Sequence, residues 1–200
     1  GGDHRKRRPH PRSEGVRSMG NASRLAIGMV ELNSIARGIE TCDYMVKAAQ
    51  VDLIRSSTVC PGKYMILIAG DTGDVKASMA EGIKRGGECV VDTLTLPNVH
   101  PQVIQAISMT TQVEKPGAVG VLEFYSVASA ITAADVAAKA NITLIEVRIG
   151  YAIGGKGYVT LTGDVGAVRA AVAAAEREAE LLVGTTVIPR PSPKLFQSLL

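Results

Sequence analysis

Apolar positions recur with helical spacing in two matching stretches of the chain. Intervals of four, three and four residues place one set on a single helical face, first in Ile35, Ile39, Cys42 and Val46, then in Val127, Ile131, Ala134 and Ala138. These faces predict helices near 34–49 and 126–140. Asp71 and Asp164, each just after a glycine, suit the N-cap of a second helix and predict helices over about 72–85 and 165–179. Strand-like apolar runs lie between them, at 26–32, 51–58, 64–69, 88–95, 118–124, 142–149, 157–162 and 181–187. Each half therefore reads β-α-β-β-α-β, which predicts an α/β (α+β) ferredoxin-like unit, a four-stranded antiparallel sheet with both helices on one face.

The two halves are copies of one unit. The segment Ala26-Ile-Gly-Met-Val-Glu-Leu reappears 92 residues later as Ala118-Val-Gly-Val-Leu-Glu-Phe, and Gly62-Lys63 returns as Gly155-Lys156. The register changes by one residue only in turns, where insertions are tolerated. We therefore expect one domain over 24–115 and a second over 116–200, joined at Pro116-Gly117.

The basic character of the chain is confined to its first residues. The net charge is +3, yet residues 1–18 alone hold six basic and two acidic side chains, so the remainder is close to neutral. Residues 1–23 are also poor in apolar residues and contain Pro9 and Pro11, which predicts a disordered basic arm. A solvated leader is favoured over nucleic-acid binding. No apolar run approaches the roughly 18–20 residues of a membrane span, so no membrane role is expected.

Three cysteines give neither an even disulfide framework nor a C-x-x-C pair. Reduced thiols in a bacterial cytoplasm are the expectation. Cys42 lies on an apolar helical face and Cys89 opens a strand, so both are predicted to be structural. Cys60 stands apart, because it lies in the turn Cys60-Pro61-Gly62 between two strands.

Enzymatic signatures are weak. Gly150-Tyr-Ala-Ile-Gly-Gly-Lys156 approaches a phosphate-binding loop, but Gly157 follows the lysine where Ser or Thr is needed, and a strand follows where a helix should begin. Glu31 and Glu123 alternate with apolar strand residues and are predicted to be structural rather than an acid–base pair. His100, the only histidine outside the arm, is expected to be hydrogen-bonded or solvated. We expect a protein that is not an enzyme.

The repeated pattern resembles a known family. In both copies G-x-x-E-x-x-S is followed by a D-x-x-x-K helix, by G-K after a turn and by G-D before the second helix, and the second copy ends in I-P-R-P. This order and spacing resemble the bacterial microcompartment (BMC) shell domain, a component of protein shells that enclose enzymes. The resemblance implies a homotrimer whose six domains form a pseudo-hexamer, and it implies edge-to-edge partners among hexameric shell proteins. Enclosed redox enzymes are the further partners that it suggests.

The resemblance also assigns roles to residues. It implies that two turns line a central pore: Val59, Cys60, Pro61 and Gly62, and Ile153, Gly154 and Gly155. The first turn is similar to that of tandem shell proteins of propanediol-utilisation microcompartments, in which the matching cysteine binds a [4Fe-4S] cluster. Cys60 is thus the expected metal ligand, with one cluster per trimer for electron transfer across the shell. Contacts with neighbouring tiles are expected at Lys47, Lys139 and Arg190, although the first copy has Asn98 where the second has Arg190.

Two other functions stay open at this stage. One is a shell trimer whose pore conducts metabolites and holds no cluster. The other, of a different class, is a soluble ferredoxin-like regulator that binds a small molecule between subunits.

Overall fold

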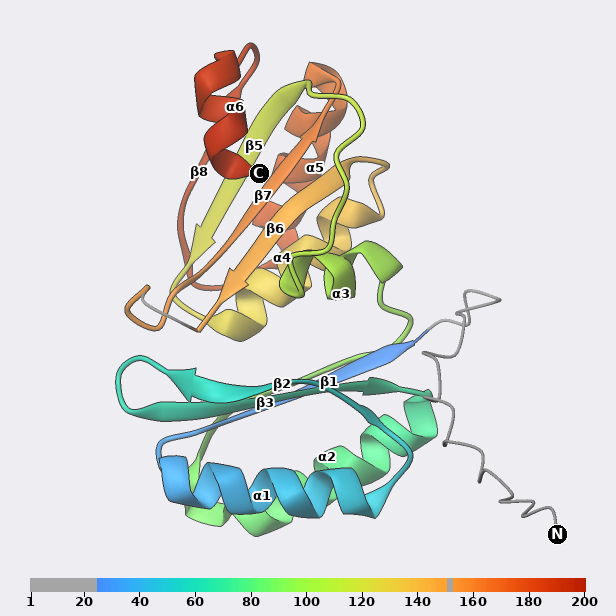
Figure 1. Ribbon diagram of the computed structural model, residues 1–200, viewed down its shortest axis with the longest axis vertical. Helices are drawn as coiled ribbons and strands as arrows, with labels where there is room; N and C mark the ends of the chain where they lie inside the picture. The colour runs from blue at the N-terminus through green and yellow to red at the C-terminus, as the bar shows by residue number, and fades with distance from the viewer. Residues whose placement is uncertain (1–24, 151–152) are drawn as a thin grey trace, which may run out of the picture.

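A computed structural model describes residues 25–150 and 153–200 (Figure 1). The predicted basic arm over 1–23 lies outside the described residues, as do Tyr151 and Ala152 of the second predicted pore turn. The first copy consists of β1 (Ala26–Leu32), α1 (Ile35–Ala48), β2 (Asp52–Val59), β3 (Lys63–Gly70), α2 (Thr72–Gly86), the short 3-10 turn η1 (Gly87–Cys89) and β4 (Val90–Leu96). The second consists of β5 (Ala118–Phe124), α4 (Val127–Ala138), β6 (Thr143–Ile149), β7 (Gly157–Gly163), α5 (Val165–Glu178) and β8 (Leu182–Ile188). The predicted fold class is confirmed.

The two sheets repeat one another in strand order and in register. The orders are β2-β3-β1-β4 and β6-β7-β5-β8, with every pair antiparallel. Ala26 faces Gly70 across the first sheet, and Ala118 faces Gly163 at the same place in the second. A shift in the pairing register of the edge strand also recurs, just before Arg55 in β2 and just before Glu146 in β6. The duplication read from the sequence therefore extends to details of hydrogen bonding.

Two short helices were not predicted. α3 (Pro101–Ile107) follows the first unit and α6 (Pro193–Leu199) follows the second, each beginning with a proline. Proline suits the first helical position because its missing N–H has no partner there anyway. α6 lies on the face of the second sheet opposite α4 and α5 (Figure 1), where Phe196 joins Val119 and Ile145 in a small buried cluster.

The first sheet is covered on both faces. Gly28 faces α2, since a Cβ added to it would lie 2.8 Å from the Cγ of Met79 and 3.0 Å from Val75. Its neighbours Ile27 and Met29 therefore face the other way, yet both are 0% exposed. They belong to one buried cluster that continues into the second domain through α3 and α4. The second domain thus packs against the sheet face that α1 and α2 leave open.

The predicted apolar face of α1 is wrong in part. Ile35 is 40% and Ile39 55% exposed, and the helix instead buries a neighbouring stripe made of Gly38, Thr41, Cys42 and Met45. In α4 the corresponding Val127 and Ile131 are 1% and 0% exposed. The difference arises because α4 contacts both its own sheet and the first domain, whereas α1 contacts its own unit only.

Candidate functional site

The two predicted pore turns lie against each other within one chain. The amide of Cys60 donates a hydrogen bond to the carbonyl of Gly150, with a nitrogen–oxygen distance of 3.4 Å. A Cβ added to Gly155 would lie 2.7 Å from the carbonyl oxygen of Cys60, closer than such atoms approach in practice. The position of Cys60 is therefore set by the turn of the second domain as well as by its own.

Glycines make both turns possible. Gly62 has φ +61°, Gly154 +63° and Gly155 +81°, a left-handed region that residues with a Cβ adopt only at a cost. The peptide bond between Cys60 and Pro61 is cis.

Among the three cysteines, only Cys60 is exposed. Pro61 and Gly62 are exposed beside it. Cys42 is buried, as predicted, and Cys89 is partly buried against the core of the first unit.

Val59, which is predicted to line the pore, is instead 1% exposed, and its side chain lies in the core between the domains. In the second turn Gly154 is exposed, while Ile153 and Gly155 are half-buried.

A lysine–glutamate pair stands at the base of each turn. Lys63 pairs with Glu31, which is 3% exposed, and Lys156 pairs with Glu123 at 2.8 Å between Nζ and Oε1. The hydrogen bond that Lys156 donates to Glu123 raises the pKa of Lys156. Each glutamate therefore forms an ion pair with a lysine, and these partners are not predicted from the sequence. One feature of the sequence indicates these pairs. In both domains a lysine follows the turn, and the first strand contains a single glutamate among apolar residues.

Arg55 connects the domains beside the turns. Its guanidinium donates to the carbonyl of Ile149 at 3.2 Å and to the carbonyl of Ile107 at 2.8 Å. Burial, and secondarily the charge of Arg148, lower the pKa of Arg55. The corresponding residue of the second copy is Glu146, which pairs with Arg148 instead. This link was not predicted, because nothing in the sequence shows that β2 and β6 are neighbours.

The three predicted edge residues lie on separate elements and do not form one site within the chain. Lys47 pairs with Asp43 at the end of α1 at 2.6 Å, and this hydrogen bond raises the pKa of Lys47. Lys139 pairs with Asp135 at 2.5 Å. Arg190 is exposed after β8.

Asp135 does more than hold Lys139. It also accepts a hydrogen bond at 2.7 Å from the amide of His100, which is the N-cap of α3. The His100 ring is hydrogen-bonded, as expected, because its Nδ1 accepts a hydrogen bond from the amide of Gln102 at 3.2 Å.

Over residues 25–150 and 153–200, no group of three or more His, Cys, Asp or Glu side chains is arranged to hold a metal ion. No helix in that part of the chain is both long and apolar enough to cross a bilayer. Within this part of the chain, the paired turns offer one exposed thiol, that of Cys60.

Comparison with known proteins identifies the family. A family model for the BMC domain matches residues 26–99 and 118–191. A bacterial microcompartment shell protein, PduT of Citrobacter freundii, is 46% identical over 178 residues, covering 87% of this chain and 97% of its own. Carboxysome shell protein CcmK2 of Synechocystis is 30% identical over 97 residues, covering 46% of this chain and 94% of its own.

A solved structure agrees with these relatives. A crystal structure of a microcompartment protein from Desulfitobacterium hafniense superposes with a TM-score of 0.83 at 50% identity, covering 88% of this chain and 99% of that one. These relatives favour a shell component over a small-molecule regulator. The chain belongs to the BMC-domain family of bacterial microcompartment shell proteins, with two such domains in tandem.

Proposed function

We propose that three copies of this protein close into a ring-shaped shell tile, and that the three Cys60 thiols meet at its axis to hold one [4Fe-4S] cluster. The observation that carries the ring is the unequal burial of two equivalent helices. The face of α4 that includes Ile131 is fully buried against the first domain, while the same face of α1, which includes Ile39, is exposed.

The surface that would receive α1 lies on the second sheet. Met29, Glu31 and Met65 of the first sheet are at most 3% exposed beneath the second domain. Their counterparts in the second sheet, Val121, Glu123 and Tyr158, are only half-buried. One chain therefore presents, at one end, a sheet face that α6 covers only in part and, at the other, an exposed helix face.

If this contact repeats from one chain to the next, the chains associate head to tail. Such an association gives a closed ring when the rotations between successive chains add up to a full turn. Six domains around the axis correspond to three chains. Such a tile joins other shell proteins edge to edge, with Lys47, Lys139 and Arg190 available on the outside of the protomer.

The cluster proposal rests on the chemistry and position of Cys60. Thiolates are the usual ligands of iron–sulfur clusters, typically four for each cluster. One exposed cysteine per chain is insufficient alone, but three copies supply three thiolates, which leaves one iron for a non-protein ligand. The open backbone at Gly62, where a Cβ would meet nothing within 4 Å, leaves space beside the thiol. When bound, the cluster supplies reversible one-electron transfer between the two sides of the shell.

The alternative is a pore without a cluster that conducts small metabolites. It is favoured by the same exposed turn and by the lack of a complete ligand set among the described residues of one chain.

Purification without oxygen distinguishes these functions. We expect a trimeric mass, a brown colour, and iron and sulfide in the amounts of one cluster per trimer. Cys60→Ser should lose the iron and keep the trimer, while Cys89→Ser, a matched control in the same chain, should keep both. A colourless, iron-free trimer would favour the open pore, and a monomer or dimer would contradict the ring itself.

A further inference from the structure

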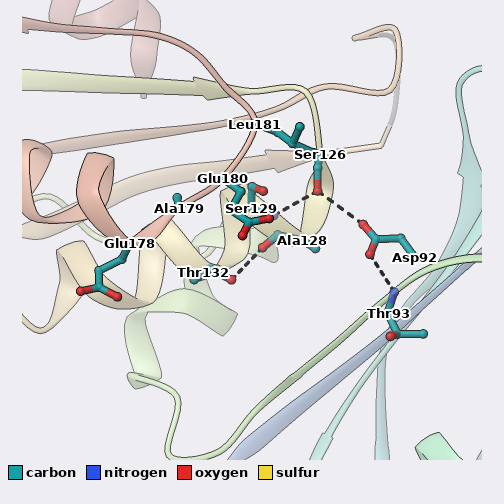
Figure 2. A pocket seen from close by; sticks show the side chains of 10 residues that line it. All are labelled: Asp92, Thr93, Ser126, Ala128, Ser129, Thr132, Glu178, Ala179, Glu180 and Leu181. Carbon is teal, nitrogen blue, oxygen red and sulfur yellow. Dashed lines mark hydrogen bonds between the residues drawn. The ribbon is translucent and has the colours of Figure 1, made fainter.

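A polar pocket lies between the two domains, away from the paired turns (Figure 2). Its volume is about 290 Å³, near the lower end of the range for small-molecule sites. One wall is β4 of the first domain, and the others are the start of α4 and the segment that follows α5. The charged and hydroxyl groups that line it are Asp92, Glu178, Glu180, Ser126, Ser129 and Thr132. Every ionisable group in this lining is a carboxylate, which favours a cationic ligand.

Ser129 provides an observation independent of the acidic residues. It is 8% exposed, and its amide donates to the hydroxyl of Ser126 at 3.2 Å. Ser129 is also one of the residues that line the pocket, and a serine hydroxyl can donate a hydrogen bond to a polar ligand or accept one from it.

The duplicated unit shows what occupies the equivalent place in the first copy. The counterpart of Ser129 is Arg37, whose guanidinium donates at 3.3 Å to the carbonyl of Arg85 near the end of α2. The counterpart of Arg85 at the end of α5 is Glu178. In the first copy a cation of the chain itself therefore bridges the two helix ends. In the second copy serine replaces that arginine, and a pocket with carboxylates remains.

Two further features favour a cation that donates hydrogen bonds. The last carbonyls of a helix lack intrahelical partners and carry a partial negative charge, and Glu178 and Glu180 add to this charge at the end of α5. Asp92 already accepts hydrogen bonds from the Thr93 amide at 2.9 Å and the Ser126 hydroxyl at 3.4 Å, but a carboxylate retains further acceptor capacity. No three of these groups are arranged to bind a bare metal ion.

We propose that this pocket binds a small organic cation with several N–H donors, an alkylguanidinium or a short diamine. The ligand takes the place that the Arg37 guanidinium has in the first copy. Neither Cys60 nor the exposed face of α1 contributes to the pocket, so the site is independent of the cluster and of ring closure.

The test is titration calorimetry on the intact, assembled protein with agmatine, putrescine or magnesium chloride at constant ionic strength. We expect saturable binding of agmatine or putrescine that weakens as salt is raised, because Glu178 and Glu180 are exposed to solvent. Ser129→Arg restores the arginine of the first copy and should weaken binding by about tenfold or more, since a hydrogen bond to a charged group contributes roughly 1.5–3 kcal/mol.

A second variant keeps the test decisive if Ser129→Arg perturbs folding. Glu180→Gln changes charge without adding volume and should weaken binding several-fold, whereas Glu114→Gln, an exposed carboxylate outside the pocket, should leave it unchanged. The proposal is overturned if the wild-type protein shows no saturable binding of either amine. It is also overturned if Glu180→Gln binds either amine as tightly as wild type does. The same holds if both variants weaken magnesium binding as much as they weaken amine binding.

Discussion

Ile39→Glu is the change that most directly tests how copies of this protein associate. Ile39 is 55% exposed on α1, whereas its counterpart Ile131 on α4 is completely buried between the domains. If the ring repeats the internal contact, Ile39 becomes buried against the second sheet of the next copy. A carboxylate at this position would then have to be desolvated in every contact of the ring.

The expected loss follows from the burial of Ile39. Fully burying an isoleucine side chain contributes about 1.5–3 kcal/mol. The 55% still exposed in the single chain then corresponds to about 0.8–1.6 kcal/mol per contact, or about 2.5–5 kcal/mol over the three contacts of a trimer. Burying an unpaired carboxylate adds an effective penalty of several kcal/mol per contact. The variant should therefore be monomeric at micromolar concentrations, while each chain stays folded.

Ile83→Glu is the matched control. Ile83 is 47% exposed on α2, but its counterpart in the second copy is Glu176, an exposed carboxylate, so the ring does not require this position to be apolar. Sedimentation velocity over a range of concentrations measures both variants against wild type. A trimer of unchanged stability for Ile39→Glu, or equal dissociation of both variants, would refute the repetition of the internal contact.

Two further changes test the paired turns and the link between the domains. Gly155→Ala should lower the melting temperature and change the rate at which Cys60 reacts with a thiol reagent, because the added Cβ would lie 2.7 Å from the carbonyl of Cys60. Gly154→Ala, which shares a positive φ but meets nothing within 4 Å, should show only the smaller backbone cost of about 1–2 kcal/mol; an equal effect on Cys60 would contradict direct contact. Arg55→Gln shortens the side chain that donates to two backbone carbonyls of the second domain and α3, and should lower the free energy of unfolding by about 2 kcal/mol, measured by denaturant titration. An unchanged unfolding midpoint would show that solvent replaces these hydrogen bonds without loss.

The sequence predicts the order of helices and strands well because the same order occurs in both domains. A strand or helix that is ambiguous in one copy is supported by its counterpart, as α5 is by α2. The prediction of α1 was incomplete for a physical reason. That helix has two apolar stripes, and periodicity alone favoured the one with larger side chains. The buried stripe includes Gly38, where a Cβ would lie 2.5 Å from the Cβ of Tyr64, so close packing requires the residue with the smallest side chain.

The features that are not predicted from the sequence depend on contacts between the two domains of the chain. Gly150 and Gly155 contact Cys60, and Arg55 donates a hydrogen bond to Ile149. These contacts join segments about ninety residues apart. No local pattern marks such residues. A comparison of the two copies does mark them, because Arg55 corresponds to Glu146, and Arg37 corresponds to Ser129. Positions at which duplicated units differ in charge are therefore the first places to look for functions that the scaffold does not require.

The two sheet faces that receive a helix are not chemically equal, and this bears on how the shell assembles. The face covered within the chain presents Met65, which is 0% exposed, where the second sheet presents Tyr158, which is half-buried. The more apolar contact is thus the one closed during folding, so it is never left open to solvent or to a wrong partner. In the ring proposed above, the more polar contact is the one that forms between chains, and polar surface tolerates exposure before assembly. In that ring, the α1 helix of one chain docks on the second sheet of the next chain, because α4 already occupies the first sheet.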